Sequence, residues 1–306
     1  MSSNPVVTSA EVAAALADGR AVVALESTIF STLGLPVPHN REALARCESA
    51  VRRAGAVPAV TAVIDGVPTV GLEADQIDPV LAGTRKMSAR DLGVAVGQRW
   101  DVGVTTVAAA VTLAARVGVS VFATGGIGGV HRGAEVSGDI SADLGALARE
   151  PVVTVTAGAK AFLDLPRTVE YLDTLGVPLL GYRTDEFPAF YSRTSGVPLR
   201  LRVESPAEIA AIARGCRSVS YGGGIVVANP IPHAAEIPAA EIEAVLDDAL
   251  RALDDAGVRG AAVTPFVLEA VGRATEGRSL PANLALAEAN ARLAAAIAVA
   301  LAAESA

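Results

Sequence analysis

The sequence predicts a layered α/β fold with a mostly parallel central sheet. Strand-like and helix-like segments alternate along most of the chain, which is the usual signature of this architecture. With 306 residues, of which 51% are hydrophobic, the chain is long enough to bury a substantial core. No linker, internal repeat or low-complexity segment beyond alanine richness interrupts the alternation, so we expect a single domain over residues 1–306.

The first half of the chain begins with a helix and then alternates buried strands with helices. Apolar residues spaced to make one buried face predict the helices, and short apolar runs predict the strands. In chain order, the predicted elements are a helix near 10–17, a strand in 21–28, a helix over 41–55 with Asn40 as its N-cap, a strand over 57–64, a short strand in 65–72 after a hairpin turn, and helices in 89–98 and 105–118.

The second half continues the same alternation. In chain order, the predicted elements are a strand in 120–126 that ends in glycines, a short helix over 141–150, a strand in 152–158, an amphipathic helix over 167–176, a strand over 177–182, a helix over 205–216 with Ser205 as its cap and Pro206 at its first position, a strand and turn in 222–232, a long helix over 238–257 that Gly257 ends, and helices over 264–277 and about 280–302.

The composition excludes several classes of protein. A net charge of −8 and the absence of a basic block argue against a nucleic-acid surface. The apolar residues lie mostly in short runs, so we expect no membrane span, and the N-terminus lacks the pattern of a secretory signal. Cys47 and Cys216 have neither CxxC spacing nor nearby histidines, which excludes a disulfide framework and a zinc site. We therefore expect a cytoplasmic protein.

Several polar residues directly follow predicted strands. In open α/β sheets the ligand binds beyond the carboxyl ends of the strands. Glu26, the glycine run 125–129, Lys160 and Asn229 all occupy such positions. Glu26 ends a buried strand, where an unpaired carboxylate is so costly that it needs a function or a partner.

Lysine is rare in this chain, which makes its two lysines informative. Of 25 basic residues only Lys86 and Lys160 are lysines. Arginine serves any role that needs only charge or solubility, whereas a Schiff-base nucleophile or a compact phosphate donor needs an amine. Lys160 is therefore a candidate nucleophile, with a solvated surface lysine as the plain alternative.

Other polar candidates follow the strand that ends in glycines. The glycine run lets backbone amides approach a phosphate, but no GK[ST] follows, and an ordinary turn explains it nearly as well. Asp139 and Asp143 offer oxygen ligands to a hard divalent metal, while an N-cap role for Asp139 or Ser141 is the alternative. His131 could bind phosphate, shuttle a proton or be a satisfied polar residue.

Seven motifs in the chain carry a resemblance to a known family. They are ALESTI at 24–29, ARDL at 89–92, TTVAA at 105–109, ATGGIGGVHRGAE at 123–135, DISADL at 139–144, AGAK at 157–160 and VANPIP at 227–232. These motifs are long and are not shared with the common α/β superfamilies. In this order, and over nearly the whole chain, they resemble the pseudouridine-5′-phosphate glycosidase family, including its C-ribosylating biosynthetic relatives.

The resemblance implies a fold, a partner and a set of site residues. The fold is three-layer α/β/α, the assembly a homotrimer, and the cofactor Mn²⁺ or a similar divalent metal. Lys160 matches the nucleophile of the family, Glu26 its proton donor and Asp139 its metal ligand. The matching substrate-binding positions are Lys86, Val107, His131, Ser141, Ala142, Asp143 and Asn283.

The implied activity is the reversible conversion of pseudouridine 5′-phosphate and water to uracil and ribose 5-phosphate. A C-glycosidic bond offers no leaving heteroatom to protonate, so hydrolysis by two carboxylates is not available. The residue types fit another route. Glu26 protonates the ribose ring oxygen and opens the ring, and the Lys160 amine bonds C1 and then forms an imine that water hydrolyses.

The chain departs from the family pattern where the aglycone would bind. The loop after ESTI is one residue longer and lacks a His-Gly pair, Gly138 replaces an aromatic residue, and Ala110 and Val111 replace Thr-Met. The missing ring at Gly138 predicts a wider aglycone pocket, with a neighbour such as Phe30 refilling the space as the alternative.

Two other functions remain open. One is a C-glycosynthase that joins ribose 5-phosphate to a larger aromatic, polyketide-type aglycone in antibiotic biosynthesis. The other is a non-catalytic sugar-phosphate sensor. The presence of both lysines, Glu26 and Asp139 argues against the sensor, because a binding module could use arginine at each amine. All three functions involve a sugar phosphate, and neither nucleic acid nor membrane is an expected partner.

Overall fold

The structure is a computed structural model that describes residues 6–257 and 263–303. Its strands are β1 (Val7–Thr8), β2 (Val22–Leu25), β3 (Val57–Ile64), β4 (Val67–Val70), β5 (Lys86–Met87), β6 (Val102–Thr105), β7 (Val121–Ala123), β8 (Val130–His131), β9 (Val153–Thr156), β10 (Leu163–Asp164), β11 (Leu179–Tyr182), β12 (Leu201–Val203) and β13 (Ile225–Ala228). Its α-helices are α1 (Ala10–Ala17), α2 (His39–Arg53), α3 (Ala74–Leu81), α4 (Leu92–Gly97), α5 (Val107–Arg116), α6 (Ala134–Ser137), α7 (Ala142–Arg149), α8 (Leu165–Thr174), α9 (Pro206–Ser218), α10 (Ala239–Asp255), α11 (Val263–Ala274) and α12 (Ser279–Ala302).

Eleven of the strands form one sheet in the order β1-β4-β3-β2-β7-β9-β13-β11-β12, with β6 paired to β3 and β5 paired to β6. From β3 to β12 every neighbouring pair along this order is parallel. The long strand β3 pairs in parallel with β2 over 57–60 and antiparallel with β4 over 61–64. The predicted mostly parallel sheet is therefore confirmed.

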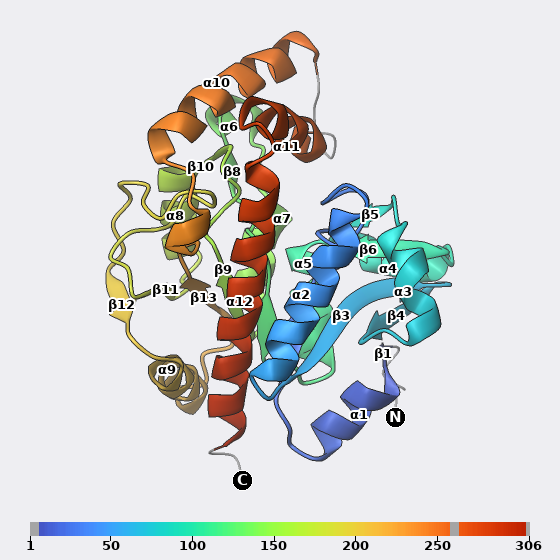
Figure 1. Cartoon of the computed structure of the whole chain (residues 1–306). Coiled ribbons are helices and arrows are strands. Elements are labelled where there is room, and N and C mark those ends of the chain that lie inside the picture. Colours follow the sequence, from blue (N-terminus) through green and yellow to red (C-terminus); the bar gives the residue numbers. More distant parts are fainter. Residues whose placement is uncertain (1–5, 258–262, 304–306) are drawn as a thin grey trace.

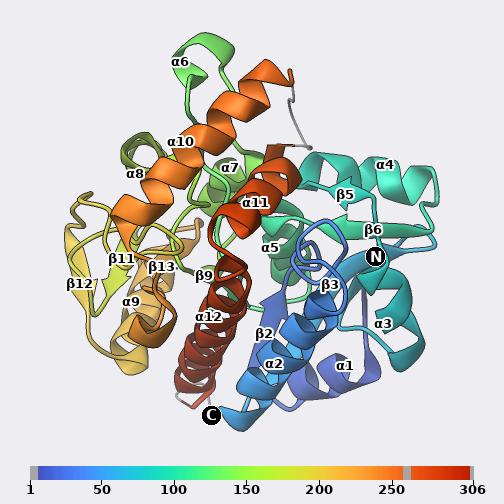
Figure 2. The same cartoon turned by 45° about the horizontal axis from the view of Figure 1, so that its top comes forward.

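Helices cover both faces of this sheet. On one face α12 packs against α2 and α9, and on the other α5 packs against α7 (Figure 1). This is the three-layer α/β/α arrangement. The helices α10 and α11 pack against each other beyond one end of the layers (Figure 2).

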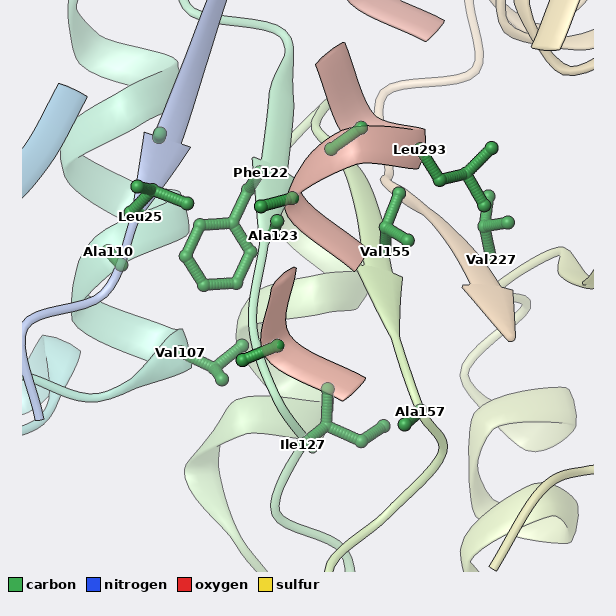
Figure 3. Packing of buried hydrophobic residues seen from close by; sticks show 14 of the residues in the cluster. Leu25, Val107, Ala110, Phe122, Ala123, Ile127, Val155, Ala157, Val227 and Leu293 are labelled. Carbon is green, nitrogen blue, oxygen red and sulfur yellow. The ribbon is translucent and has the colours of Figure 1, made fainter. Parts of the chain in front are cut away.

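The core lies between these layers. Figure 3 shows Leu25, Phe122 and Val155 of three neighbouring strands packed between Ala110 of α5 and Leu293 of α12. Phe122, Val155 and Ala110 have no exposed surface, and Leu25 is 2% exposed. Burying a side chain of the size of leucine or phenylalanine contributes about 1.5–3 kcal/mol relative to leaving it in water. The layers are therefore held together mainly by apolar contacts on both faces of the strands.

Helix α12 is the one segment among the described residues that resembles a membrane span in length and composition. Residues 279–302 form a helix that is long and apolar enough to cross a bilayer, with a mean hydropathy of 1.6 over its most apolar window. However, 67% of that window is buried inside the protein, where it packs on α2, α9 and the sheet. Its hydropathy is therefore accounted for by its place in the core.

One local prediction was wrong, and several elements were not predicted, among them α3 and β6. Asn40 does not cap α2, because the helix begins at His39, and the buried Asn40 amide instead donates to the Leu81 carbonyl at 3.2 Å. Strand β6 was not predicted, although it pairs with β3 and β5 in the sheet. Its strand pattern is interrupted by Gly103, where a Cβ would lie 3.2 Å from the Met87 sulfur.

Candidate active site

The carboxyl ends of the parallel strands bring the main candidates to one edge of the sheet. Because Leu25 of β2 pairs with Ala123 of β7, Glu26 and Thr124 follow neighbouring strands at the same level. Lys160 lies beyond β9, where its backbone N–H donates to the Ile127 carbonyl at 3.1 Å. Glu26, Lys86 and Lys160 together line two adjoining cavities.

Glu26 is a buried acid. The residue is 8% exposed, and its Oε1 accepts a hydrogen bond from the Thr124 hydroxyl. Burial raises the pKa of Glu26 from 4.5 to about 7, although the charge of Lys160, the bond from Thr124 and the charge of Lys86 all oppose this rise. A carboxyl with this pKa keeps a proton in a good fraction of molecules at neutral pH, as a general acid must.

The charge of Lys160 acts on Lys86 across the site. Burial lowers the pKa of Lys86, and the nearby charge of Lys160 lowers it further, whereas Asp143 and Glu26 oppose the change. A positive charge close to an ammonium group disfavours the charged form of that group. A doubly negative group placed between them would relieve this repulsion.

The first cavity is polar and has a volume of about 270 Å³. Apart from Asn283, every substrate-binding position implied by the resemblance lines it: Lys86, Val107, His131, Ser141, Ala142 and Asp143, together with Asp139. We call it the polar cavity.

Two buried hydroxyls in the polar cavity lack a partner among the described residues, namely Ser88 Oγ and Thr106 Oγ1. Thr106 is the N-cap of α5, yet its side chain makes no capping bond. Buried polar atoms are rarely left unpaired, and a helix N-terminus favours anions. With Arg90 also on the wall, this end of the polar cavity is suited to a phosphate.

Asp143 supports the wall of the polar cavity. Its Oδ1 accepts from the Ala108 N–H and its Oδ2 from the Gly128 N–H, each at 2.9 Å. Ser141 caps α7, as the alternative from the sequence had it, by accepting from the Asp143 N–H at 3.2 Å. A Cβ on Gly128 would lie 2.7 Å from Asp143 Oδ2, so glycine is needed there for close approach, and its N–H is not free for a phosphate.

His131 and Asp139 face each other across the mouth of the polar cavity, with Nδ1 and Oδ2 3.8 Å apart. Burial lowers the pKa of His131, and the charges of Lys160 and Lys86 lower it further, while Asp139 opposes them. No cluster of three or more His, Cys, Asp or Glu side chains among the described residues is placed to hold a metal.

The half-exposed Asp139 carboxylate fits a hard divalent cation that keeps most of its waters. It does not fit zinc, which takes three or four side-chain ligands.

The second cavity is largely apolar and has a volume of about 310 Å³. Its walls include Ile29 and Leu33 from the loop after β2, Phe162, and Val267 and Val271 of α11. Asn283, the remaining predicted substrate-binding residue, lines it from α12, and its buried Oδ1 has no partner among the described residues. We call it the apolar cavity. Because Glu26, Lys86 and Lys160 line both cavities, they lie at the junction of the two.

Gly138 does not lie beside a cavity, although the sequence predicted a wider aglycone pocket there. It is exposed, ends α6 with a φ of +67°, lines neither cavity, and a Cβ there would meet nothing within 4 Å. Within one chain the expected void beside the aglycone is therefore not at Gly138. Phe30 does not refill that space either, because it is buried in the core. Asn229 also lines neither cavity, and its side chain donates to Asn290 instead.

Several residues of the site were not predicted. Thr124, Ser88 and Thr106 carry hydroxyls, which are too common in sequences to attract attention. The signal that could have found them is position, since Thr124 directly follows a buried strand and Thr106 directly precedes a helix. The walls from α10 and α11 give no such signal, because their apolar residues look like those of any amphipathic helix.

Comparison with known proteins assigns the chain to a family. A family model described as indigoidine synthase A like protein matches residues 11–300. The chain belongs to the indigoidine synthase A-like family. Over 295 residues it is 54% identical to the pseudouridine-5′-phosphate glycosidase of Methylobacterium nodulans, covering 95% of this chain and 86% of that protein. Over 301 residues it is 52% identical to the enzyme of the same name from Paracoccus denitrificans, covering 96% and 97%.

Two solved structures have the same fold as this chain. The chain is similar to the prealnumycin C-glycosynthase AlnA in complex with ribulose 5-phosphate, with a TM-score of 0.90, 38% identity and 98% of each chain covered. It is also similar to an indigoidine synthase A-like protein from Thermotoga maritima, with a TM-score of 0.87, 36% identity, and 97% and 96% of the two chains covered. The resemblance carried by the seven motifs is thus confirmed over the full length of the fold.

Proposed function

We propose that this protein is a C-glycosidase that cleaves and forms the bond between C1 of ribose 5-phosphate and an aglycone carbon, with pseudouridine 5′-phosphate as its substrate. The observation that carries the proposal is the junction of the two cavities, where a buried acid and both lysines of the chain meet. Relatives with 54% and 52% identity are named pseudouridine-5′-phosphate glycosidases.

The two cavities divide the substrate between them. The phosphate binds in the polar cavity, where the Ser88 and Thr106 hydroxyls supply donors and the N-terminus of α5 favours negative charge. The uracil ring lies in the apolar cavity, and the free Asn283 Oδ1 accepts a hydrogen bond from one of its N–H groups. C1 of the ribose then lies at the junction, within reach of Glu26 and Lys160.

The reaction follows from the groups at the junction. Protonated Glu26 gives its proton to the ribose ring oxygen, and the bond between that oxygen and C1 breaks. The Lys160 amine uses its lone pair to bond C1 and returns a proton to Glu26. The pair of the C1–aglycone bond then leaves with the aglycone carbon, which takes up a proton, while the nitrogen pair forms an imine with C1. Water hydrolyses the imine and releases ribose 5-phosphate.

A divalent metal such as Mn²⁺ is part of this proposal. Asp139 would hold it through one carboxylate, with waters and substrate oxygens as its other ligands. When bound, the metal would act as a template that orients the sugar phosphate. His131, 3.8 Å from Asp139, would keep that carboxylate turned toward the cavity. The homotrimeric assembly and the cytoplasmic location both stay predictions.

Reductive trapping tests the proposal. Borohydride added with ribose 5-phosphate should attach one sugar phosphate to Lys160, and peptide mapping is simple because the chain has only two lysines. Lys160→Arg should abolish both the adduct and turnover, whereas the matched variant Lys86→Arg should still be trapped. An adduct on Lys86, or turnover without any adduct, contradicts the mechanism. Binding of ribose 5-phosphate with neither adduct nor turnover would instead identify a sensor.

A second candidate function is synthesis of a C-riboside with a larger aromatic aglycone. An outer cavity of about 520 Å³, bounded by the loop 32–36 and α11, shares Leu33, Gly34, Tyr191 and Asn283 with the apolar cavity. A ring system longer than uracil could therefore extend from one into the other. AlnA, a C-glycosynthase, has the same fold.

Gly272 lines only the outer cavity, and a Cβ there would make ordinary contact, 3.8 Å from Ser279 Oγ. If the second function is real, Gly272→Phe should block polycyclic aglycones and leave cleavage of pseudouridine 5′-phosphate intact. Ala274→Phe, on the exposed side of the same helix, is the control. A wild-type protein that ignores every aglycone larger than uracil excludes this function.

A further inference from the structure

Buried polar groups connect Glu26 to the middle of α12. The Thr124 hydroxyl donates to Glu26 Oε1, and the Thr124 carbonyl accepts from Asn290 Nδ2 at 2.8 Å. Asn290 Oδ1 in turn accepts from Asn229 Nδ2 at 2.8 Å. All four residues are at most 9% exposed, so water does not compete readily for these bonds. These hydrogen bonds form a continuous chain from Asn229 through Asn290 and Thr124 to Oε1 of Glu26.

The backbone of Thr124 is held from two directions. Its N–H donates to the Val155 carbonyl at 3.0 Å, which continues the ladder between β7 and β9. Its carbonyl is tied to α12 through Asn290, a side chain with no exposed surface. With both backbone groups bonded, the Cα of Thr124 is held in place, and its β-branched side chain has few χ1 rotamers, so its hydroxyl stays close to Glu26.

We infer that Thr124 is a positioning residue that fixes the acidic proton of Glu26 on Oε2. A threonine hydroxyl has a single hydrogen to donate, and among the described residues Oε1 is the acceptor recorded for it. If the proton were on Oε1, Oε1 would become the donor and the Thr124 hydroxyl oxygen the acceptor. The buried hydrogen of the Thr124 hydroxyl would then have no acceptor, which is costly. No hydrogen bond from the described residues reaches Oε2. The inference rests on the proposed role of Glu26 as the ring-opening acid.

The charged groups around Glu26 make the contribution of Thr124 measurable. Lys160 and Lys86 favour the ionised carboxylate, Asp143 disfavours it, and burial disfavours it most strongly. The Thr124 bond also favours the ionised form, so its removal should raise the pKa of Glu26 above its value of about 7. Because the acid works only when protonated, activity should then persist to higher pH.

Thr124→Val keeps the shape of the side chain and removes its donor, while Thr124→Ser keeps the donor. The pKa of Glu26 can be read by NMR of protein labelled with [¹³C]glutamate, with the resonance assigned by its loss in Glu26→Gln. We expect Thr124→Val to raise this pKa by roughly one unit and to move the basic limb of the kcat profile by the same amount. We also expect kcat at the optimum to fall roughly tenfold with KM nearly unchanged, and Thr124→Ser to restore all three.

Two results overturn the inference. One is a Thr124→Val variant with an unmoved pKa and basic limb, and the other is an equal loss of kcat in the valine and serine variants. The thermal midpoint of each variant shows whether it is folded, and the NMR titration does not depend on turnover. The proposed function fails in a different way. It is refuted if the wild-type protein neither cleaves nor forms a C-riboside, whereas the inference alone is refuted if the wild type is active and the Thr124→Val variant behaves like it.

Discussion

Glu26 links the stability of the protein to its chemistry. Its pKa rises from 4.5 to about 7 on folding because the carboxyl is buried. Between these two pH values the folded chain holds the proton more tightly than the unfolded chain does, so stability falls as the pH rises. Above about pH 7 we expect the ionised carboxylate to destabilise the fold by about 3 kcal/mol, since each pKa unit corresponds to about 1.4 kcal/mol.

Glu26→Gln should therefore be inactive and more stable than the wild type. The amide cannot ionise, so we expect a gain of up to about 3 kcal/mol in the free energy of unfolding at about pH 8 and none at about pH 4. Urea denaturation at the two pH values measures the difference. Glu243→Gln, at an exposed position of α10, is the control and should show no such trend. Equal stability of Glu26→Gln and wild type at high pH would mean that the carboxyl is not held neutral by burial.

The sequence identifies candidate reactive residues more readily than the residues proposed to position them. Glu26 and Lys160 could be found because an acid at the end of a buried strand and a rare amine are unusual. Thr124 could not, because its role depends on which oxygen its hydroxyl meets, and this is set by the pairing of β2 with β7. The prediction of a wider aglycone pocket at Gly138 was wrong for a related reason. A substitution next to a motif does not say which way the chain turns there.

Helix α5 packs against the sheet along its length and has its N-terminus at the polar cavity. Its residues Ala108, Ala109 and Ala110 have no exposed surface, so the helix is fixed against the sheet. Its N-terminus opens into the polar cavity, where Thr106 makes no capping bond of its own. Asp143 accepts from the Ala108 N–H and so holds the first turn in place. The N-terminal dipole and a free hydroxyl are thus directed toward the same space.

Thr106→Val should weaken binding of the phosphate with little effect on the fold. We expect KM for pseudouridine 5′-phosphate to rise roughly tenfold and kcat to change little, because the lost bond is present in both the ground and transition states. Cleavage of unphosphorylated pseudouridine should not change. The control is Thr112→Val in the same helix, which removes a bond to Glu150 far from either cavity. Equal losses with both substrates would place the phosphate elsewhere.

The layered α/β fold was predictable from the alternation of strands and helices, and its three-layer α/β/α form was implied by the family resemblance, but the order of the strands was not predictable. Alternating strands and helices predict a layered arrangement because each helix must cover a face of the sheet. Strand order depends on contacts between distant segments, and the chain places β13 between β9 and β11. The same holds for the cavities. The apolar cavity takes Ile29 from one end of the chain and Val271 from the other.

Because the site draws on residues from 26 to 283, binding should stabilise the entire chain. A ligand that binds only the folded state at one hundred times its Kd adds about 2.7 kcal/mol, which corresponds to a rise of a few degrees in Tm. Ribose 5-phosphate should raise the Tm of the wild type by at least this amount, since an imine adds to the affinity. Lys160→Met should show a smaller rise from the phosphate contacts alone, and ribose without phosphate should show almost none. An equal rise in wild type and Lys160→Met would mean that the sugar phosphate binds without bonding to Lys160.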